Sequence, residues 1–314
     1  MPVATVRAAC RRTPLPRIDS IREFAPAKVN LCLHVTGRRD DGYHLLDSLV
    51  IFAGIGDWLD AAPAAAPSLE LTGPFGPALP GGTENLVSRA AAAIFPGLPL
   101  AFRLEKHLPP ASGIGGGSSD AAAAIRAALR LVPPGTRPDA AEIVRIAARL
   151  GADIPVCLSP GPARMRGIGE IIEPLTGFPS GGILLVNPGV EVPTPAVFRA
   201  LTRRENPPLP ARLPAWPDIA TLAAWARDQR NDLEKPAREL APVIGEVIDQ
   251  LKALPGALMA RMSGSGATCF ALFADEAAAR AALPLIAHSN PAWWTSAGPI
   301  LPGPGKAPDG ICAA

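Results

Sequence analysis

The sequence predicts an α+β protein with two domains, and two observations lead to that prediction. The chain has 314 residues, about twice the roughly 150 residues of an average domain, so it is long enough to bury two cores. Segments with the two-residue period of strands are mixed with helical segments. They do not follow a regular strand–helix–strand repeat, and this favours α+β over a parallel α/β sheet.

The first half begins with a predicted strand and a tight turn. Residues 29–35 alternate between apolar and more polar side chains, as a half-buried strand does. Asp41-Gly42 is a strong turn signal before the next apolar segment, residues 44–55. Residues 61–82 are rich in Ala, Pro and Gly and predict short strands and loops. Alanine content, length and an apolar stripe indicate helices at residues 85–94, 118–131 and 140–150.

A second unit is predicted to begin near Gly181. Residues 183–186 read as a short buried strand, and the proline-rich residues 203–217 read as a surface loop. A helix at residues 243–254 and a strand at residues 269–273 follow. The predicted division is a flexible extension at 1–21, an N-terminal domain at 22–178, a C-terminal domain at 179–298 and a flexible tail at 299–314.

Composition excludes several classes of protein. Thirty Lys and Arg against 28 Asp and Glu give a net charge of +2, and there is one tyrosine. This argues against a nucleic-acid-binding protein, which needs a basic footprint or a stacking platform. Five scattered cysteines without a C-x-x-C pair fit reduced thiols, and the four histidines lack zinc-ligand spacing. With no apolar run of about 20 residues, we expect a cytoplasmic protein without a membrane partner; no feature indicates an oligomeric state.

The most informative segment is glycine-rich and precedes a predicted helix. Residues 108–120 read Leu-Pro-Pro-Ala-Ser-Gly-Ile-Gly-Gly-Gly-Ser-Ser-Asp. Glycines let the backbone approach a ligand, and a helix start presents free N–H groups to a phosphate. The segment lacks the lysine of a Walker A loop and the third glycine of a Rossmann loop. An ordinary turn is the alternative to phosphate binding. Ser118 and Ser119 either cap the helix or face a phosphate or magnesium.

Four other features allow a structural or a functional interpretation. Residues 262–267 form a second glycine cluster, which is either a bulge or a partner of the first loop. Lys28 is a solvated residue at a strand start or an active-site cation. Asp153 is a turn former or a general base. Tyr43, next to His44, is a half-buried loop aromatic or a ring that stacks on a base or sugar.

Together these segments resemble the GHMP kinase superfamily, from about residue 22 to 275. The opening resembles the members that act on a cytidine diphosphate-linked methylerythritol. Residues Ala111 and Ser112 replace glycines often found there, and residues 61–82 and 203–217 match no part of the family pattern. The matching segments are residues 26–31, 37–44, 108–120, 151–155, 231–234 and 262–266.

The resemblance implies a two-domain fold with the active site in the cleft between the domains. It also implies ATP- and Mg²⁺-dependent phosphorylation of the 2-hydroxyl of 4-diphosphocytidyl-2-C-methyl-D-erythritol, in non-mevalonate isoprenoid precursor biosynthesis. Asp153 would act as base, and Lys28 would keep it ionised and stabilise the alkoxide. The residues that would cradle the triphosphate are Pro109, Pro110, Ala111, Ser112, Gly113, Ile114, Gly115, Gly116, Gly117, Ser118 and Ser119.

The same resemblance assigns the substrate side of the cleft. Tyr43 would stack on cytosine, His44 would bond its edge, and Asn30 would line the acceptor site. Thr194 and Phe198 would flank the substrate. Glu234 is interpreted as structural, because a carboxylate is favourable at a helix start. Two alternatives stay open: a mevalonate- or homoserine-type kinase of the same superfamily, and a nucleotide-binding regulator without catalysis.

Overall fold

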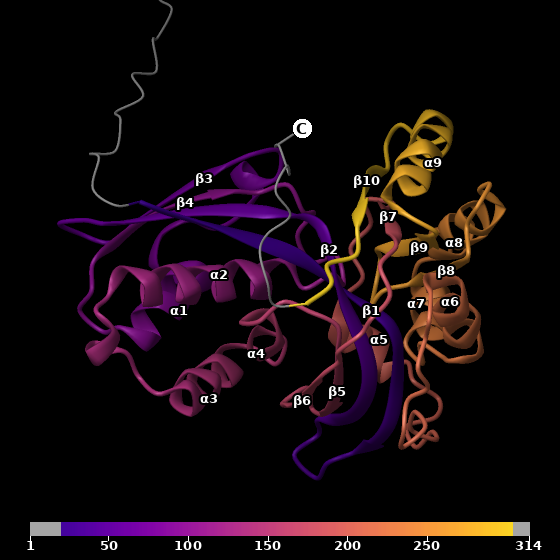
Figure 1. The fold of residues 1–314 in the computed structure, drawn as a ribbon, viewed down its shortest axis with the longest axis horizontal. Coiled ribbons are helices and arrows are strands. Elements are labelled where there is room, and N and C mark those ends of the chain that lie inside the picture. Colours follow the sequence, from indigo (N-terminus) through magenta and orange to yellow (C-terminus); the bar gives the residue numbers. More distant parts are fainter. Residues whose placement is uncertain (1–19, 304–314) are drawn as a thin grey trace, which may run out of the picture.

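Two β-sheets packed against each other make up the centre of this computed structural model, which describes residues 20–303 (Figure 1). Residues 1–19 of the predicted extension and 304–314 of the predicted tail lie outside the described residues, and the extension was predicted slightly too long because Ile21 begins β1. The first sheet has the order β3-β4-β2-β5-β6 with β1 paired to β2, and the second has the order β10-β7-β9-β8. The strands are β1 (Ile21–Arg38), β2 (His44–Pro63), β3 (Ser68–Thr72), β4 (Leu100–Glu105), β5 (Ala163–Gly167), β6 (Ile171–Pro174), β7 (Gly182–Asn187), β8 (Met259–Met262), β9 (Cys269–Phe273) and β10 (Trp294–Pro299).

Helices cover the outer faces of the two sheets, which confirms the predicted α+β class. Asn85, Asp139, Asp218 and Asp275 each accept a backbone N–H at a helix start, the usual role of short polar side chains there. The helices are α1 (Leu86–Ile94), α2 (Gly116–Leu131), α3 (Ala140–Leu150), α4 (Ile154–Cys157), α5 (Thr194–Arg199), α6 (Ile219–Asp228), α7 (Glu234–Leu240), α8 (Val243–Ala253) and α9 (Glu276–Ser289).

The β1–β2 hairpin is the longest feature of the fold and follows from the predicted turn. Gly42 has a φ of +92° and donates to Arg39 O at 3.0 Å, closing the turn. The expected alternation of burial along residues 29–35 is wrong, since every residue from 24 to 35 is buried. The reason is that the apolar residues pack in cores shared with the second sheet, while Asn30 contacts Ser263 and His34 contacts Pro207 of the 203–217 loop.

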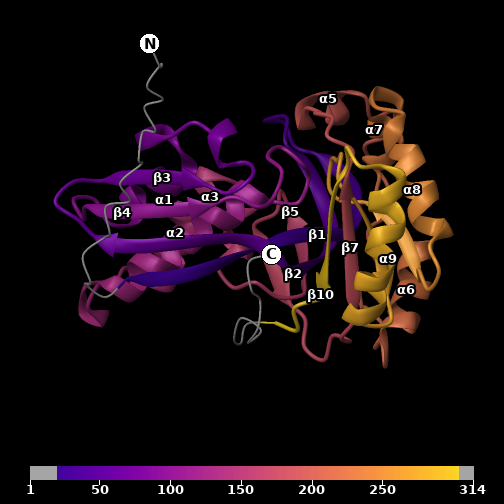
Figure 2. The same cartoon turned by 90° about the horizontal axis from the view of Figure 1, so that it is seen from above.

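The second sheet lies between the first sheet and an outer pair of helices (Figure 2). Ile183 and Leu185 on β7 face the hairpin and α6, whereas Leu184 and Val186 face α8 and α9. This double burial explains why β7 reads as a continuous apolar run. The hairpin contributes to the cores on both sides, so the division at residues 178 and 179 stays a prediction.

Two segments expected to be peripheral are tied to the first sheet. Residues 203–217 form a loop, as predicted, but Arg164 pairs with Asp47 at 2.7 Å and also donates to Pro210 O at 2.9 Å. The predicted tail from residue 299 begins too early, because Pro299 ends β10 and Leu301 N donates to Phe52 O at 2.8 Å. Within residues 20–303, no helix has the length and apolarity needed to cross a bilayer.

Candidate active site

Lys28 and Asp153 form an ion pair at the centre of the candidate site. Lys28 Nζ lies 2.9 Å from Asp153 Oδ2, and the two side chains are 5% and 37% exposed. The pair therefore combines a buried cation with a carboxylate that solvent or a ligand can reach. A carboxylate in reach of a ligand can accept a proton from it, and a cation at this distance can neutralise negative charge that develops beside it.

The structure excludes the solvated-residue interpretation of Lys28 and keeps both interpretations of Asp153, which lies in a turn. Lys28 lies inside β1, opposite Phe52 of β2, rather than at a solvated strand start. The strand pairing shifts between Pro26 and Lys28, and Lys28 N donates instead to Ile114 O at 2.9 Å. Asp153 precedes α4 but makes no capping bond with its side chain. The carboxylate is thus left to face Lys28.

The glycine-rich loop uses its carbonyls internally and leaves its N–H groups without acceptors. Ser112 O accepts from Thr268 N at 3.1 Å, and Ile114 O accepts from Lys28 N. Among the described residues, no backbone N–H from 111 to 118 donates a hydrogen bond. These groups lie at the start of the sixteen-residue helix α2, whose dipole adds partial positive charge. A phosphate is the ligand that such an arrangement favours.

Two glycines show why this loop needs residues without a side chain. Gly115 has a φ of +64°, and a Cβ there would lie 3.2 Å from the side chain of Lys28. Gly113 has a φ of +76°, and its Cβ would lie 2.7 Å from Gly266 O. The first glycine loop therefore packs directly on the second cluster and on the lysine.

Ser263 joins the second glycine cluster to β1, the strand that carries Lys28 and Asn30. Its hydroxyl accepts from Asn30 N at 3.1 Å and donates to Gly113 O at 3.0 Å. Further along the same cluster, the Ser265 hydroxyl bonds Thr194 Oγ1 at 2.7 Å. Residues 262–267 are thus in contact with the first loop, β1 and α5, which a simple strand bulge would not require.

Asn30 faces the lysine rather than an open cleft. Its Oδ1 accepts from Lys28 Nζ at 3.1 Å, and its Nδ2 donates to Ser48 Oγ at 2.6 Å. Both ends of the amide are therefore used within the protein. Asn30 borders the site as expected, but its side chain acts on Lys28.

Ser118 and Ser119 do not cap α2, so the capping alternative is wrong. The helix begins at Gly116, two residues earlier than predicted, and Gly115 is its N-cap without a side-chain bond. Ser119 is fully buried, and its side chain faces the buried Cys157. The phosphate or metal interpretation therefore stays for the Ser118 hydroxyl at this helix start.

The residues assigned to the substrate base gather where the hairpin turn meets α5. The His44 ring stacks on Phe198 with centroids 4.7 Å apart, and His44 Nε2 has no partner among the described residues. Burial lowers the pKa of His44, and the positive charges of Arg38 and Arg204 lower it further, which favours the neutral ring. Tyr43 is 60% exposed, more than a half-buried loop aromatic would be.

Sequence reasoning missed a buried charge cluster under the phosphate loop. Lys106 Nζ lies 2.5 Å from Asp57 Oδ2 and 2.6 Å from Asp120 Oδ2. Asp57 Oδ1 also accepts from Leu108 N at 2.8 Å, which holds the start of the loop. Burial lowers the pKa of Lys106, but Asp120 and Asp57 outweigh it, so that pKa is raised. A signal was available, because Lys106 is one of only five lysines and directly precedes the loop.

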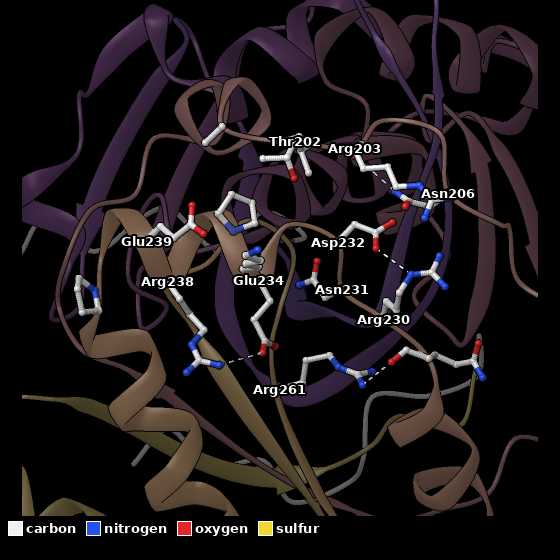
Figure 3. Close-up of a pocket in the computed structure, with 16 residues that line it drawn as sticks. Thr202, Arg203, Asn206, Arg230, Asn231, Asp232, Glu234, Arg238, Glu239 and Arg261 are labelled. Atoms are coloured by element: carbon white, nitrogen blue, oxygen red, sulfur yellow. Dashed lines mark hydrogen bonds and ion pairs between the residues drawn. The ribbon is translucent and has the colours of Figure 1, made fainter.

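A separate cavity of about 690 Å³ lies beside α7 (Figure 3). None of the residues predicted to bind substrate or ATP lines it. Asn231, in its wall, donates to Met262 O at 2.9 Å and to Gly264 O at 2.8 Å. Glu234 accepts from Met262 N at 3.2 Å and faces Arg238. These side chains support the second glycine cluster, in keeping with a structural role for Glu234.

Comparison with known proteins gives the class first. Two family models match: the GHMP kinases N terminal domain on residues 85–161 and the GHMP kinases C terminal on residues 211–284. A crystal structure of homoserine kinase from Cytophaga hutchinsonii, 19% identical, aligns with a TM-score of 0.63 over 92% of this chain and 97% of that one. This likeness concerns the fold alone. The fold and the two models together define a kinase of the GHMP class, an enzyme that phosphorylates small molecules.

Closer relatives narrow the class. A 4-diphosphocytidyl-2-C-methyl-D-erythritol kinase of Cereibacter sphaeroides is 56% identical over 276 residues, 87% of this chain and 96% of that protein. One of Jannaschia sp. is 53% identical over 90% of this chain and 98% of that protein. A crystal structure of 4-(cytidine 5'-diphospho)-2C-methyl-D-erythritol kinase, 35% identical, aligns with a TM-score of 0.70 over 89% and 99% of the two chains. The chain belongs to the 4-diphosphocytidyl-2-C-methyl-D-erythritol kinase family, as its motifs predict.

Proposed function

We propose that this chain transfers the γ-phosphoryl group of ATP to the 2-hydroxyl of 4-diphosphocytidyl-2-C-methyl-D-erythritol. The reaction is a step of non-mevalonate isoprenoid precursor biosynthesis. The observation that carries the proposal is the Lys28–Asp153 pair, which joins a reachable carboxylate to a buried ammonium at 2.9 Å. The family relationship supports the choice of substrate.

Asp153 is the base in this proposal, and Lys28 is the electrostatic partner. Asp153 takes the proton of the acceptor hydroxyl as the new oxygen–phosphorus bond forms. The bond from the γ-phosphorus to the bridging oxygen breaks, and ADP leaves with that oxygen. Lys28 holds Asp153 ionised and neutralises charge on the acceptor oxygen. Phosphoryl transfer depends mainly on positioning and charge neutralisation, and a general base contributes about 10²–10⁴-fold.

The phosphate loop holds the triphosphate through its backbone. The N–H groups of residues 111–118, which have no acceptor among the described residues, are directed to the phosphate oxygens. Pro109 and Pro110 have no N–H and act by fixing the shape of the loop entrance. Gly117 has no atom within 4 Å of an added Cβ, so the phosphates approach over it.

Magnesium fits the oxygen donors at this helix start. Among residues 20–303, no group of three or more His, Cys, Asp or Glu side chains forms a metal cluster. Kinases need no such cluster, because Mg²⁺ is held by one or two protein oxygens together with the nucleotide phosphates. The Ser118 hydroxyl at this helix start is the protein oxygen that would hold it, together with the nucleotide phosphates. Bound Mg²⁺ would neutralise phosphate charge.

A line of contacts connects the Lys28–Asp153 pair to the proposed binding site for the cytosine ring. It runs from Asn30 through Ser263 and Ser265 to Thr194, and along α5 to Phe198 and His44. The exposed Tyr43 ring stacks on cytosine, and the neutral His44 ring bonds its edge through Nε2. The buried, unpaired Cys32, Cys157 and Cys269 are consistent with a reaction in the cytoplasm.

The test is ADP release by the purified chain with Mg-ATP and one acceptor at a time. We expect turnover with 4-diphosphocytidyl-2-C-methyl-D-erythritol and none with mevalonate or homoserine. Turnover with mevalonate or homoserine would favour the other superfamily kinases and contradict the proposed cytosine-binding site. Binding of ATP without turnover on any acceptor would favour a regulator.

Substitution of Tyr43 tests the proposed cytosine-binding site in the same assay. A base stacked on an aromatic ring contributes about 1–3 kcal/mol. Tyr43→Ala is therefore expected to raise the KM for the cytidyl substrate by about tenfold or more, with kcat almost unchanged. Leu285→Ala removes an equally exposed apolar side chain from α9 and is the matched control. An unchanged KM in the Tyr43 variant would exclude stacking.

A further inference from the structure

Ser48 lies beside the reacting pair but belongs to none of the motifs. Ser48 is a buried residue of β2. Its hydroxyl oxygen lies 2.7 Å from Cys32 O and 2.6 Å from Asn30 Nδ2. Asn30 in turn contacts Lys28, which contacts Asp153. A chain of short polar contacts therefore runs from the backbone of β1 to the proposed base.

The direction of every hydrogen bond in this chain is fixed by the first one. A carbonyl oxygen only accepts, so the Ser48 proton is committed to Cys32 O. The Ser48 oxygen is then an acceptor for Asn30, and the amide must present its Nδ2 to Ser48. Consequently Asn30 presents Oδ1 to Lys28. The flipped amide would put an NH₂ group against the ammonium and would cost both bonds.

We infer that Ser48 is a positioning residue for the phosphoryl transfer, acting through Asn30 on Lys28; the inference rests on the proposed function. The Lys28 ammonium has three protons. Asn30 Oδ1 and Asp153 Oδ2 accept two of them, at 3.1 and 2.9 Å. The third has no acceptor among the described residues, which leaves it available to the reacting oxygen.

The value of this arrangement lies in holding the ammonium before charge develops. Electrostatic stabilisation is effective when the donor is already in place, and small errors of placement are costly. If Asp153 were its only partner, the Lys28 ammonium could change position while keeping that single contact. With Asn30 locked by Ser48, two contacts on different elements define its position.

Three variants test the role of Ser48 in turnover. Ser48→Ala is expected to lower kcat about tenfold while the KM for ATP and for the cytidyl substrate stays within about twofold. Ser48→Thr keeps the hydroxyl and is expected to restore kcat to within about twofold. Thr72→Val removes a hydroxyl that bonds Leu104 O in the same sheet and is the matched control, with unchanged kcat. If Ser48→Ala does not fold, Ser48→Cys replaces it, because sulfur is a weak acceptor of similar size.

A second readout follows Lys28 itself and does not depend on turnover. With only five lysines in the chain, the ammonium signals of ¹⁵N-lysine-labelled protein can be assigned by NMR, that of Lys28 by its loss in Lys28→Met. Ser48→Ala is expected to shift the Lys28 signal and speed its proton exchange, with the buried Lys106 signal unchanged. Ser48→Thr should return the Lys28 signal to its original position.

Two results would overturn the inference. One is a kcat of Ser48→Ala within twofold of the parent chain, and the other is a lower kcat with an unshifted Lys28 signal. A parent chain that turns over no acceptor would contradict the proposed function instead. In that event the NMR comparison alone decides whether Ser48 positions Lys28.

Discussion

Lys28 and Lys106 are both buried in the first half of the molecule, and both pair with aspartate, yet their partners differ. Asp153, the partner of Lys28, is more than a third exposed. Asp57 and Asp120, the partners of Lys106, are sealed from solvent, and Asp57 also accepts two backbone N–H groups. The aspartate of the Lys28 pair is thus open to a ligand, whereas the aspartates that pair with Lys106 are closed to one.

The difference separates a reactive pair from a structural one. A carboxylate that a substrate can reach can accept its proton. Asp57, whose oxygens are occupied by internal donors, and Asp120, which is sealed from solvent, cannot. Burial raises the pKa of Asp120 well above its ordinary value, and Asp57 raises it further, although the positive charge of Lys106 opposes this shift. The Lys106 cluster therefore supports the glycine-rich loop, and the Lys28 pair is the one proposed to carry the chemistry. Three substitutions sharpen or break this comparison.

The largest effect is expected from Asp153→Asn. The amide still accepts a hydrogen bond from Lys28 but cannot take a proton, so turnover should fall by about 10²–10⁴-fold. ATP binding should stay within a few-fold, because Asp153 is not part of the loop backbone. Steady-state ADP release and a nucleotide titration measure the two quantities. Near-normal turnover of this variant would remove Asp153 as the base and, with it, the contrast between the two lysines.

Lys106→Met is expected to act on stability. It leaves Asp57 and Asp120 buried without their cation, and breaking a buried pair in this way costs about 3–5 kcal/mol of unfolding free energy. Urea unfolding measures the loss. Lys252→Met, at an exposed lysine of α8, is the control and should change stability little. A loss below about 1 kcal/mol for Lys106→Met would mean that the closed cluster is not structural.

His34 gives the smallest effect and extends the comparison to a buried base without a carboxylate. Its Nδ1 lies 3.1 Å from Pro207 O and donates to it, while Nε2 accepts from Arg230 N at 3.2 Å, so the ring is held neutral. Burial, and then the charge of Arg230, lower the pKa of His34 below about 6.5. As the pH falls, His34 therefore becomes protonated in the unfolded chain before it does in the folded chain. The free energy of unfolding consequently decreases as the pH drops below about 6.5.

Replacement of His34 by glutamine tests that dependence. His34→Gln has no ring to protonate, so its loss of stability between pH 8 and pH 5.5 is expected to be smaller than that of the parent chain. Urea midpoints at several pH values measure both slopes. His44, whose pKa is also lowered, keeps part of the slope in both proteins. Equal slopes would show that His34 is protonated without cost in the folded state.

Local signals in the sequence predicted those elements whose causes are local. The Asp41-Gly42 turn, the helix at 140–150 and the strand at 269–273 all form at the predicted positions, because turn chemistry and periodicity act over a few residues. The family assignment is confirmed for a similar reason, since its motifs are short and contiguous. The catalytic role of Lys28 and Asp153 stays a prediction.

Features that depend on strand register and on distant segments could not be read from the sequence. Lys28 was expected at a strand start because nothing in the sequence shows that a second sheet will cover β1. The contact of Asn30 with Ser48 depends on shifts of pairing at Pro26 and beyond Asn30. Asp57, Lys106 and Asp120 come from β2, the segment after β4, and α2, and no local pattern joins them.

The strand β2 has a gap in its pairing that residues 300 and 301 fill. Leu301 N donates to Phe52 O, and Ile300 forms a bridge with Ala53. During synthesis, Phe52 and Ala53 leave the ribosome roughly 250 residues before these partners, a delay on the order of tens of seconds at about 5–20 residues per second. The nascent chain therefore carries an unfinished backbone edge for that interval, and its first sheet is completed only by a segment far downstream in the sequence.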